Sequence, residues 1–180
     1  MTERYEIRLA GVGGQGLQLA GLILAEAAAV YENKNAVQSQ SYGAEARGGP
    51  SVAEVIIGDG DIDYPKVVEP DLLLALSQDA ADRYVPQVKK DGLIIVDAAS
   101  VDRLGGDKRV LRLPISGVAK EATGKPVASI VALGVIAVHT GIVSRDSIRQ
   151  AVLRRAPRGT EEMNVKALEA GFALAERVKR

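Results

Sequence analysis

The feature that most constrains the fold of this chain is a glycine-rich hexapeptide near its start, which we call the glycine loop. It reads Gly11-Val12-Gly13-Gly14-Gln15-Gly16. The pattern G-x-G-x-x-G joins a strand to a helix in nucleotide-binding α/β proteins. Residues 5–9 alternate apolar and charged, as a strand does, and residues 17–31 carry apolar side chains at helical spacing. We therefore expect strand, loop and helix, with backbone N–H groups of the loop available to an anion.

The rest of the chain continues this alternation. The runs 71–77 and 93–96 are continuously apolar, which is typical of parallel strands covered on both faces. Further strands are expected at 36–40, 51–57 and 109–115, a helix over 78–92, and helices from 127 to the end. We predict an α/β fold with three layers: a mainly parallel twisted sheet of roughly five to seven strands flanked by helices, Rossmann-like, with a helical C-terminal third. One domain should span residues 1–180.

Composition narrows the class of function. The 23 Lys and Arg residues balance the 23 Asp and Glu residues, so no global field favours nucleic acid or an anionic membrane. No apolar stretch approaches the ~20 residues that span a bilayer, and we expect a cytoplasmic protein. The absence of Cys excludes a cysteine nucleophile and thiolate-ligated iron–sulfur clusters in this chain.

The ligand of the glycine loop is not a typical dinucleotide. Dinucleotide-binding folds usually place an acidic residue at the end of the second strand to bind the ribose. Here that strand, residues 36–40, ends in amides and hydroxyls, while Glu32 belongs to the turn before it. NAD and FAD are therefore disfavoured, although the loop can still bind a phosphate. The alternative is that the glycines only form a tight turn and let the following helix pack closely.

A second motif, residues 39–51, concentrates chemistry in a loop between two strands. It contains Tyr42, Glu45, Arg47, Gly48 and Gly49. Arg47 offers a planar fork for phosphate or carboxylate, and the two glycines allow close backbone approach. Because both motifs should follow adjacent early strands, we expect Arg47 within a side-chain length of the amides of residues 13–16. The simpler alternative is a surface ion pair between Glu45 and Arg47.

Taken together, the motifs resemble a known family. GVGGQG, SQSYGAEARGG followed by SVAEVII, IDYP, PDLLLALSQDA and GLIIVD are similar to the gamma subunit of 2-oxoacid:ferredoxin oxidoreductases. The SYGAEARGG form resembles the 2-oxoglutarate, or general 2-oxoacid, branch, whereas pyruvate enzymes tend to carry a GPERRG-like loop. One departure is Ser129, where relatives usually have Asn.

The resemblance implies a subunit of an enzyme and not an enzyme that is active alone. The family decarboxylates a 2-oxoacid oxidatively to acyl-CoA and passes the electrons to ferredoxin. Thiamine diphosphate, Mg²⁺ and [4Fe–4S] clusters are implied in partner subunits, and coenzyme A could bind at the surface of this chain. The glycine loop and Tyr42, Glu45, Arg47, Gly48 and Gly49 are the expected binding residues, with no catalytic or metal-binding residue. The isolated chain could form a homodimer. The alternative is a freestanding nucleotide-binding or scaffold protein of the same fold.

Three further groups carry weaker signals. His139 ends an apolar helix, where a capping or packed role is favoured over catalysis. Asp97 closes a strand at the ligand-binding edge, yet it can equally cap the next turn with Ser100. Arg154, Arg155 and Arg158 form a positive cluster that could meet coenzyme A or an acidic partner; a solvated helix end is the simpler explanation.

Overall fold

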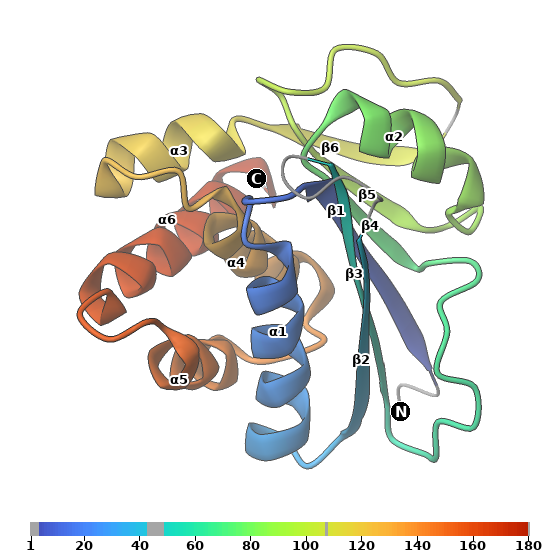
Figure 1. Cartoon of the computed structure of the whole chain (residues 1–180), viewed down its shortest axis with the longest axis horizontal. Helices are drawn as coiled ribbons and strands as arrows, with labels where there is room; N and C mark the ends of the chain where they lie inside the picture. The colour runs from blue at the N-terminus through green and yellow to red at the C-terminus, as the bar shows by residue number, and fades with distance from the viewer. Residues whose placement is uncertain (1–3, 43–48, 107, 180) are drawn as a thin grey trace.

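The computed structural model describes residues 4–42, 49–106 and 108–179. The first part of the chain contains all the described strands together with α1 and α2, and helices alone follow β6 (Figure 1). The elements are β1 (Tyr5–Val12), α1 (Leu17–Tyr31), β2 (Asn35–Tyr42), β3 (Pro50–Gly58), β4 (Leu72–Ala75), α2 (Gln78–Tyr84), the 3₁₀ turn η1 (Val85–Gln87), β5 (Leu93–Asp97), β6 (Arg109–Leu113), α3 (Ile115–Thr123), α4 (Ala128–Thr140), α5 (Arg145–Arg155) and α6 (Glu161–Lys179).

The described strands form one six-stranded sheet in the order β2-β3-β1-β4-β5-β6. The pairs β1–β4, β4–β5 and β5–β6 are parallel, whereas β3 runs antiparallel to both β1 and β2. The predicted α/β class with a mainly parallel sheet is confirmed, with one reversed strand. The expectation that the first two strands are adjacent is wrong. A short connection makes β2 and β3 a hairpin, and β3 occupies the place beside β1.

Helices cover the two faces of the sheet unequally. Five helices, α1 and α3 to α6, lie on one side of the sheet, and α2 lies on the other (Figure 1). Side chains of β1 alternate accordingly: Ile7 and Leu9 belong to the larger core under α1 and α4, and Ala10 belongs to the smaller core on the α2 side. The three-layer arrangement is thus the predicted one, with most of the apolar volume on the α1 side.

The C-terminal helices pack unusually closely. A Cβ atom at Gly134 of α4 would lie 2.5 Å from the carbonyl oxygen of Leu168, and one at Gly171 of α6 would lie 2.1 Å from that of Val131. Glycine is therefore required at this crossing, because any side chain would push the helices apart. Within the described residues, no single helix is long and apolar enough to cross a bilayer. Helices α3 and α4 are long and apolar enough only when they are taken together, and the chain bends by 114° between them.

Helix α3 was not predicted. The strand expected over 109–115 ends at Leu113, and a helix begins at Ile115. Buried Asp97, at the end of β5, accepts a hydrogen bond from the backbone N of Ser116 at 3.1 Å and so satisfies a free amide of the first turn. The buried residues of α3 are only Ile115 and Ala119. Two apolar positions are too few for sequence periodicity to reveal a helix.

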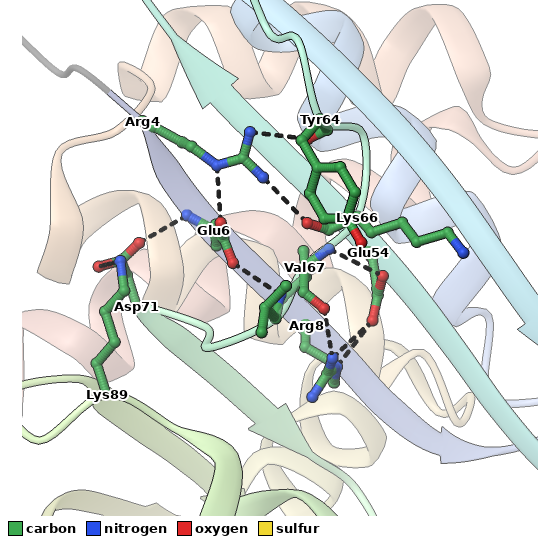
Figure 2. A network of polar contacts seen from close by, with 10 residues as sticks. Arg4, Glu6, Arg8, Glu54, Tyr64, Lys66, Val67, Asp71 and Lys89 are labelled. Atoms are coloured by element: carbon green, nitrogen blue, oxygen red, sulfur yellow. Dashed lines mark hydrogen bonds and ion pairs between the residues drawn. The ribbon is translucent and has the colours of Figure 1, made fainter.

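The segment between β3 and β4, residues 59–71, is attached to the amino end of β1 (Figure 2). Arg4 donates hydrogen bonds to the carbonyl oxygens of Tyr64 at 2.8 Å and Lys66 at 3.0 Å. The same guanidinium pairs with Glu6 at 2.7 Å. These charges have partners within the chain, so they position the segment on the sheet.

Candidate functional site

The glycine loop lies at the carboxyl end of β1, as predicted. The chain leaves β1 through α1 toward the β2 side of the sheet, whereas it leaves β4 through α2 toward β5, on the opposite face (Figure 1). The crevice between β1 and β4 is therefore the topological switch point, where open α/β sheets bind their ligands. The backbone N of Leu76, just after β4, donates to the carbonyl oxygen of Ala10 at 2.9 Å and closes the two strand ends together.

Gln15 holds the glycine loop in shape. Its Oε1 accepts a hydrogen bond from the backbone N of Val12 at 2.8 Å, and its Nε2 donates to the carbonyl oxygen of Leu76 at 3.1 Å. A Cβ atom at Gly11 would lie 2.1 Å from the same Oε1, so Gly11 leaves the space that this amide fills. Gln15 and Gly11 thus support the loop, and both ends of the Gln15 amide are used inside the chain.

The two sequence motifs meet through the backbone. Gly13 N donates to the carbonyl oxygen of Gly49 at 2.7 Å, which joins the glycine loop to the start of β3. Tyr42, at the end of β2, is aligned with Ser51 of β3. Glu45, Arg47 and Gly48 lie outside the described residues, so the expected approach of Arg47 to the loop stays a prediction.

The other two glycines of the loop, Gly14 and Gly16, differ from Gly11 and Gly13. Gly14 and Gly16 have left-handed φ angles of 90° and 77°, and a Cβ atom at Gly14 would meet nothing within 4 Å. Among the described residues, the backbone N atoms of Gly14 and Gly16 have no hydrogen-bond partner. Gly16 caps α1 without a side chain, and the first turn of α1 contains no acidic residue. Free N–H groups and the positive end of a helix dipole therefore meet here, which favours an anion.

Two pockets flank the glycine loop. The tyrosine pocket, of about 330 Å³, lies on the α2 side and includes Gly11, Val12, Gly49, Ser77, Arg83 and Tyr84. The lysine pocket, of about 400 Å³, includes Gly14, Gln15, Ser116, Lys120, Lys125 and Ala128. The residues of α2, α3 and α4 in these pockets were not predicted from the sequence as site residues. Lys125, in a Gly-Lys-Pro turn, carried the only local signal.

The aromatic wall of the tyrosine pocket, Tyr84, lies close to two cations. The guanidinium of Arg8 lies 4.9 Å from the centroid of the Tyr84 ring, and that of Arg83 lies 5.5 Å from it. These distances are in the range of cation–π attraction. The Tyr84 ring is therefore fixed beside the loop and offers a flat apolar surface.

Asp97 has the capping role that the sequence left open. Its carboxylate accepts from the hydroxyls of Ser100 and Ser116 as well as from the backbone N of Ser116. The residue is 1% exposed. It joins the end of β5 to the start of α3 and is not available to a ligand.

His139 is packed near the C-terminal end of α4, as expected. Both ring nitrogens are buried and have no hydrogen-bond partner among the described residues. Burial lowers the pKa of the imidazole, and the positive charges of Lys179 and Arg109 lower it further. The neutral form is favoured, so the ring does not act as a charged cap of the helix.

The arginine cluster at the end of α5 is largely structural. Arg154 pairs with Glu26 of α1 at 2.8 Å, and Arg155 contacts the other oxygen of the same carboxylate. The Glu26 side chain is 4% exposed, so the two arginines neutralise a buried charge. Arg158 is exposed. Within the part of the chain that the structure describes, no group of three or more His, Asp or Glu residues could hold a metal ion.

Fold and site together define a Rossmann-like protein with a glycine loop, two of whose N–H groups are free among the described residues, at the switch point of its sheet. The chain belongs to the pyruvate ferredoxin/flavodoxin oxidoreductase family, whose model matches residues 6–174. This family includes subunits of multisubunit enzymes, and the resemblance to a gamma subunit is confirmed by relatives that match almost end to end.

The chain is similar to three known proteins, of which the first two support this membership. The 2-oxoglutarate synthase subunit KorC of Methanocaldococcus jannaschii is 48% identical over 177 residues, with 96% of this chain and 95% of the relative covered. The keto/oxoacid ferredoxin oxidoreductase gamma subunit of Geobacter sulfurreducens matches with a TM-score of 0.88 at 46% identity, over 97% of each chain. The 2-oxoglutarate:ferredoxin oxidoreductase of Magnetococcus marinus, solved with 2-oxoglutarate, coenzyme A and succinyl-CoA bound, has a TM-score of 0.86 at 21% identity. That match covers 98% of this chain and 32% of the other, and it shows the shared fold alone.

Proposed function

We propose that this chain is the gamma subunit of a cytoplasmic complex that converts 2-oxoglutarate and coenzyme A to succinyl-CoA and CO₂, with the electrons passed to ferredoxin. In this proposal the whole chain acts as one gamma-type domain, and its glycine loop faces coenzyme A. The strongest support for the substrate is the similarity to KorC subunits of 2-oxoglutarate synthase. Thiamine diphosphate, Mg²⁺ and the clusters then belong to partner subunits, in keeping with a chain that has no Cys.

One observation carries the role at coenzyme A: the free backbone N–H groups at Gly14 and Gly16, at the start of α1. The side chain of Gln15 and the hydrogen bond from Gly13 N to the carbonyl oxygen of Gly49 fix the shape of this loop. Neither interaction uses the N–H groups of Gly14 and Gly16. Coenzyme A carries a pyrophosphate, which suits such donors. A protein that contains this fold was solved with coenzyme A bound. The chain therefore offers its partners a preformed phosphate loop and contributes no reacting group of its own.

Placing a carboxylate in the loop tests this role. Gly14→Asp puts a negative charge where the phosphate should bind, and like-charge repulsion should raise the KM for coenzyme A by roughly tenfold or more. The matched control is Gly159→Asp, because Gly159 has a φ of 87° and, like Gly14, open space around a built Cβ. The measurement is a coenzyme A titration of the reconstituted complex, together with equilibrium binding of coenzyme A.

Both variants carry the same backbone strain and added charge, so only the ligand site differs. Equal KM values for the two variants would contradict a phosphate role for the glycine loop. Loss of assembly in Gly14→Asp but not in Gly159→Asp, seen by size-exclusion chromatography, would instead assign the loop to a subunit interface.

Activity of the isolated chain tests the assignment as a subunit. Purified alone, the chain should give no 2-oxoglutarate-dependent reduction of viologen, because the resemblance assigns the thiamine and cluster sites to other chains. Adding the partner subunits should restore the reaction. Turnover by the chain alone would overturn the proposal.

A further inference from the structure

The lysine pocket contains two cations that no residue of the described chain neutralises. Lys120 lies in the last turn of α3, and Lys125 lies in the turn that leads to α4. Both are exposed and line the same pocket of about 400 Å³ as Gly14 of the glycine loop. Neither forms an ion pair within residues 4–42, 49–106 and 108–179. Two ammonium groups that share a pocket repel each other unless an anion binds between them.

A second helix begins at this pocket. α4 starts at Ala128, a pocket residue, and it has no side-chain cap and no acidic residue in its first turn. α1 likewise starts without a side-chain cap, at Gly16. The two starts are in contact, since a Cβ atom at Gly16 would lie 2.9 Å from Oγ of Ser129. The positive ends of both helix dipoles therefore act on the same small volume.

Ser129 gives independent support for a ligand. The residue is 4% exposed, and its hydroxyl points toward the glycine loop at Gly16. Within the described part of the chain it has no hydrogen-bond partner, and its oxygen is not among the fully enclosed polar atoms, so it keeps access to the surface beside the loop. Such a hydroxyl can donate to a ligand oxygen bound at the loop.

We propose that the lysine pocket is a second phosphate subsite, which binds the 3′-phosphate of coenzyme A while the glycine loop binds the pyrophosphate. This inference rests on the proposed function. Coenzyme A carries both groups on one ribose, and the two subsites adjoin at Gly14. A phosphate monoester has close to two negative charges at neutral pH, which matches two lysines. Lys120 and Lys125 are then the residues by which the complex distinguishes coenzyme A from 3′-dephospho-coenzyme A.

The test compares these two substrates in the reconstituted complex. The native complex should prefer coenzyme A by KM, and the double variant Lys120→Gln/Lys125→Gln should lose roughly tenfold or more of this preference. The loss should come from coenzyme A alone, with the KM for 3′-dephospho-coenzyme A unchanged. The matched control is Lys90→Gln. Lys90 is an exposed lysine just before the amino end of β5, so this variant should keep the native ratio. Calorimetric binding of both ligands should give the same ratios without turnover.

A native preference that survives in the double variant would overturn the inference. Equal weakening of both ligands would also overturn it, because it would assign the lysines to the pyrophosphate or to the fold. Inorganic phosphate separates the sources of the ligand. If phosphate inhibits the native complex but not the double variant, while both prefer coenzyme A to 3′-dephospho-coenzyme A equally, the pocket is a general phosphate site and the inference is wrong. Failure of the proposed function has a different signature, namely no effect of Gly14→Asp on either ligand.

Discussion

The two ends of β1 differ in how their polar groups are used. At the amino end, charged side chains satisfy one another and hold neighbouring segments. At the carboxyl end, backbone N–H groups and lysines remain without partners among the described residues. One strand therefore carries a structural network in its amino-terminal half and the proposed binding loop at its carboxyl end. Charged side chains alone therefore do not indicate a binding site. Hydrogen-bond donors and charges that have no partner in the described part of the chain are the better indication.

Arg8, in the amino-terminal half of β1, illustrates the structural network (Figure 2). Its side chain is 6% exposed and pairs with Glu54 of β3 at 2.8 Å. The guanidinium also donates to Gln87 at 2.7 Å and to the carbonyl oxygen of Val67 at 3.0 Å. Its face lies over the Tyr84 ring. The donors of this buried cation are thus matched by acceptors from three segments of the chain.

The largest expected effect comes from breaking this network. Arg8→Met keeps the apolar stem but leaves the carboxylate of Glu54 without its cation, and should cost about 3–5 kcal/mol of unfolding free energy. The measurement is urea denaturation of the chain. Arg103→Met is the control, because the Arg103–Asp82 pair at 3.6 Å is exposed and should contribute less than about 1 kcal/mol.

A double variant sharpens the same comparison. Arg8→Met/Glu54→Leu removes both charges, so it should recover part of the stability that Arg8→Met loses. Coenzyme A affinity of the reconstituted complex should change little in Arg103→Met, whereas the double variant also removes the cation that lies over the Tyr84 ring beside the glycine loop. Equal unfolding free energies of Arg8→Met and the double variant would show that the unpaired Glu54 carboxylate contributes little to the loss.

An intermediate effect is expected at the glycine loop. Gln15→Ala removes two hydrogen bonds to the backbone, and Gly11→Ala displaces the same amide, so each should cost about 1–3 kcal/mol. Because both act through Gln15, their costs should not add in the double variant. Thermal unfolding of the four proteins of this cycle measures the coupling. Fully additive costs would show that Gly11 matters for another reason, such as its contact with Leu17.

The smallest expected effect concerns pH. The pKa of His139 is lowered in the folded chain, first by burial, so the unfolded chain binds the proton more tightly. Stability from this residue is complete above the unfolded pKa of about 6.5 and is lost as pH falls from there toward the lowered folded value. His139→Gln should reduce the drop in unfolding free energy between pH 7.5 and pH 5. An identical drop in both proteins would show that other groups cause it.

Several elements were predictable because their signals are local. The apolar runs around 72–75 and 93–97 are buried strands, and Ser144 caps α5 by accepting from the backbone N of Ser147 at 3.0 Å. The glycine loop also follows its strand as predicted. The order of the strands was not predictable in the same way, since a hairpin between β2 and β3 competes with the parallel neighbour that a βαβ pattern implies.

The sequence by itself determined the class of fold, the family and the position of the glycine loop, because each depends on periodicity or on a motif of neighbouring residues. Only the tertiary structure decided which polar groups of the loop form hydrogen bonds within the chain and which stay free among the described residues. Gln15 and Gly13, which look like ligand-binding residues in the motif, are bonded to Leu76 and Gly49, whereas Gly14 keeps a free amide. Lys120 and Lys125 reach the same site from more than 100 residues away along the chain. These contacts form when packing brings distant segments of the chain together. A local sequence pattern cannot predict which polar groups will then find a hydrogen-bond partner.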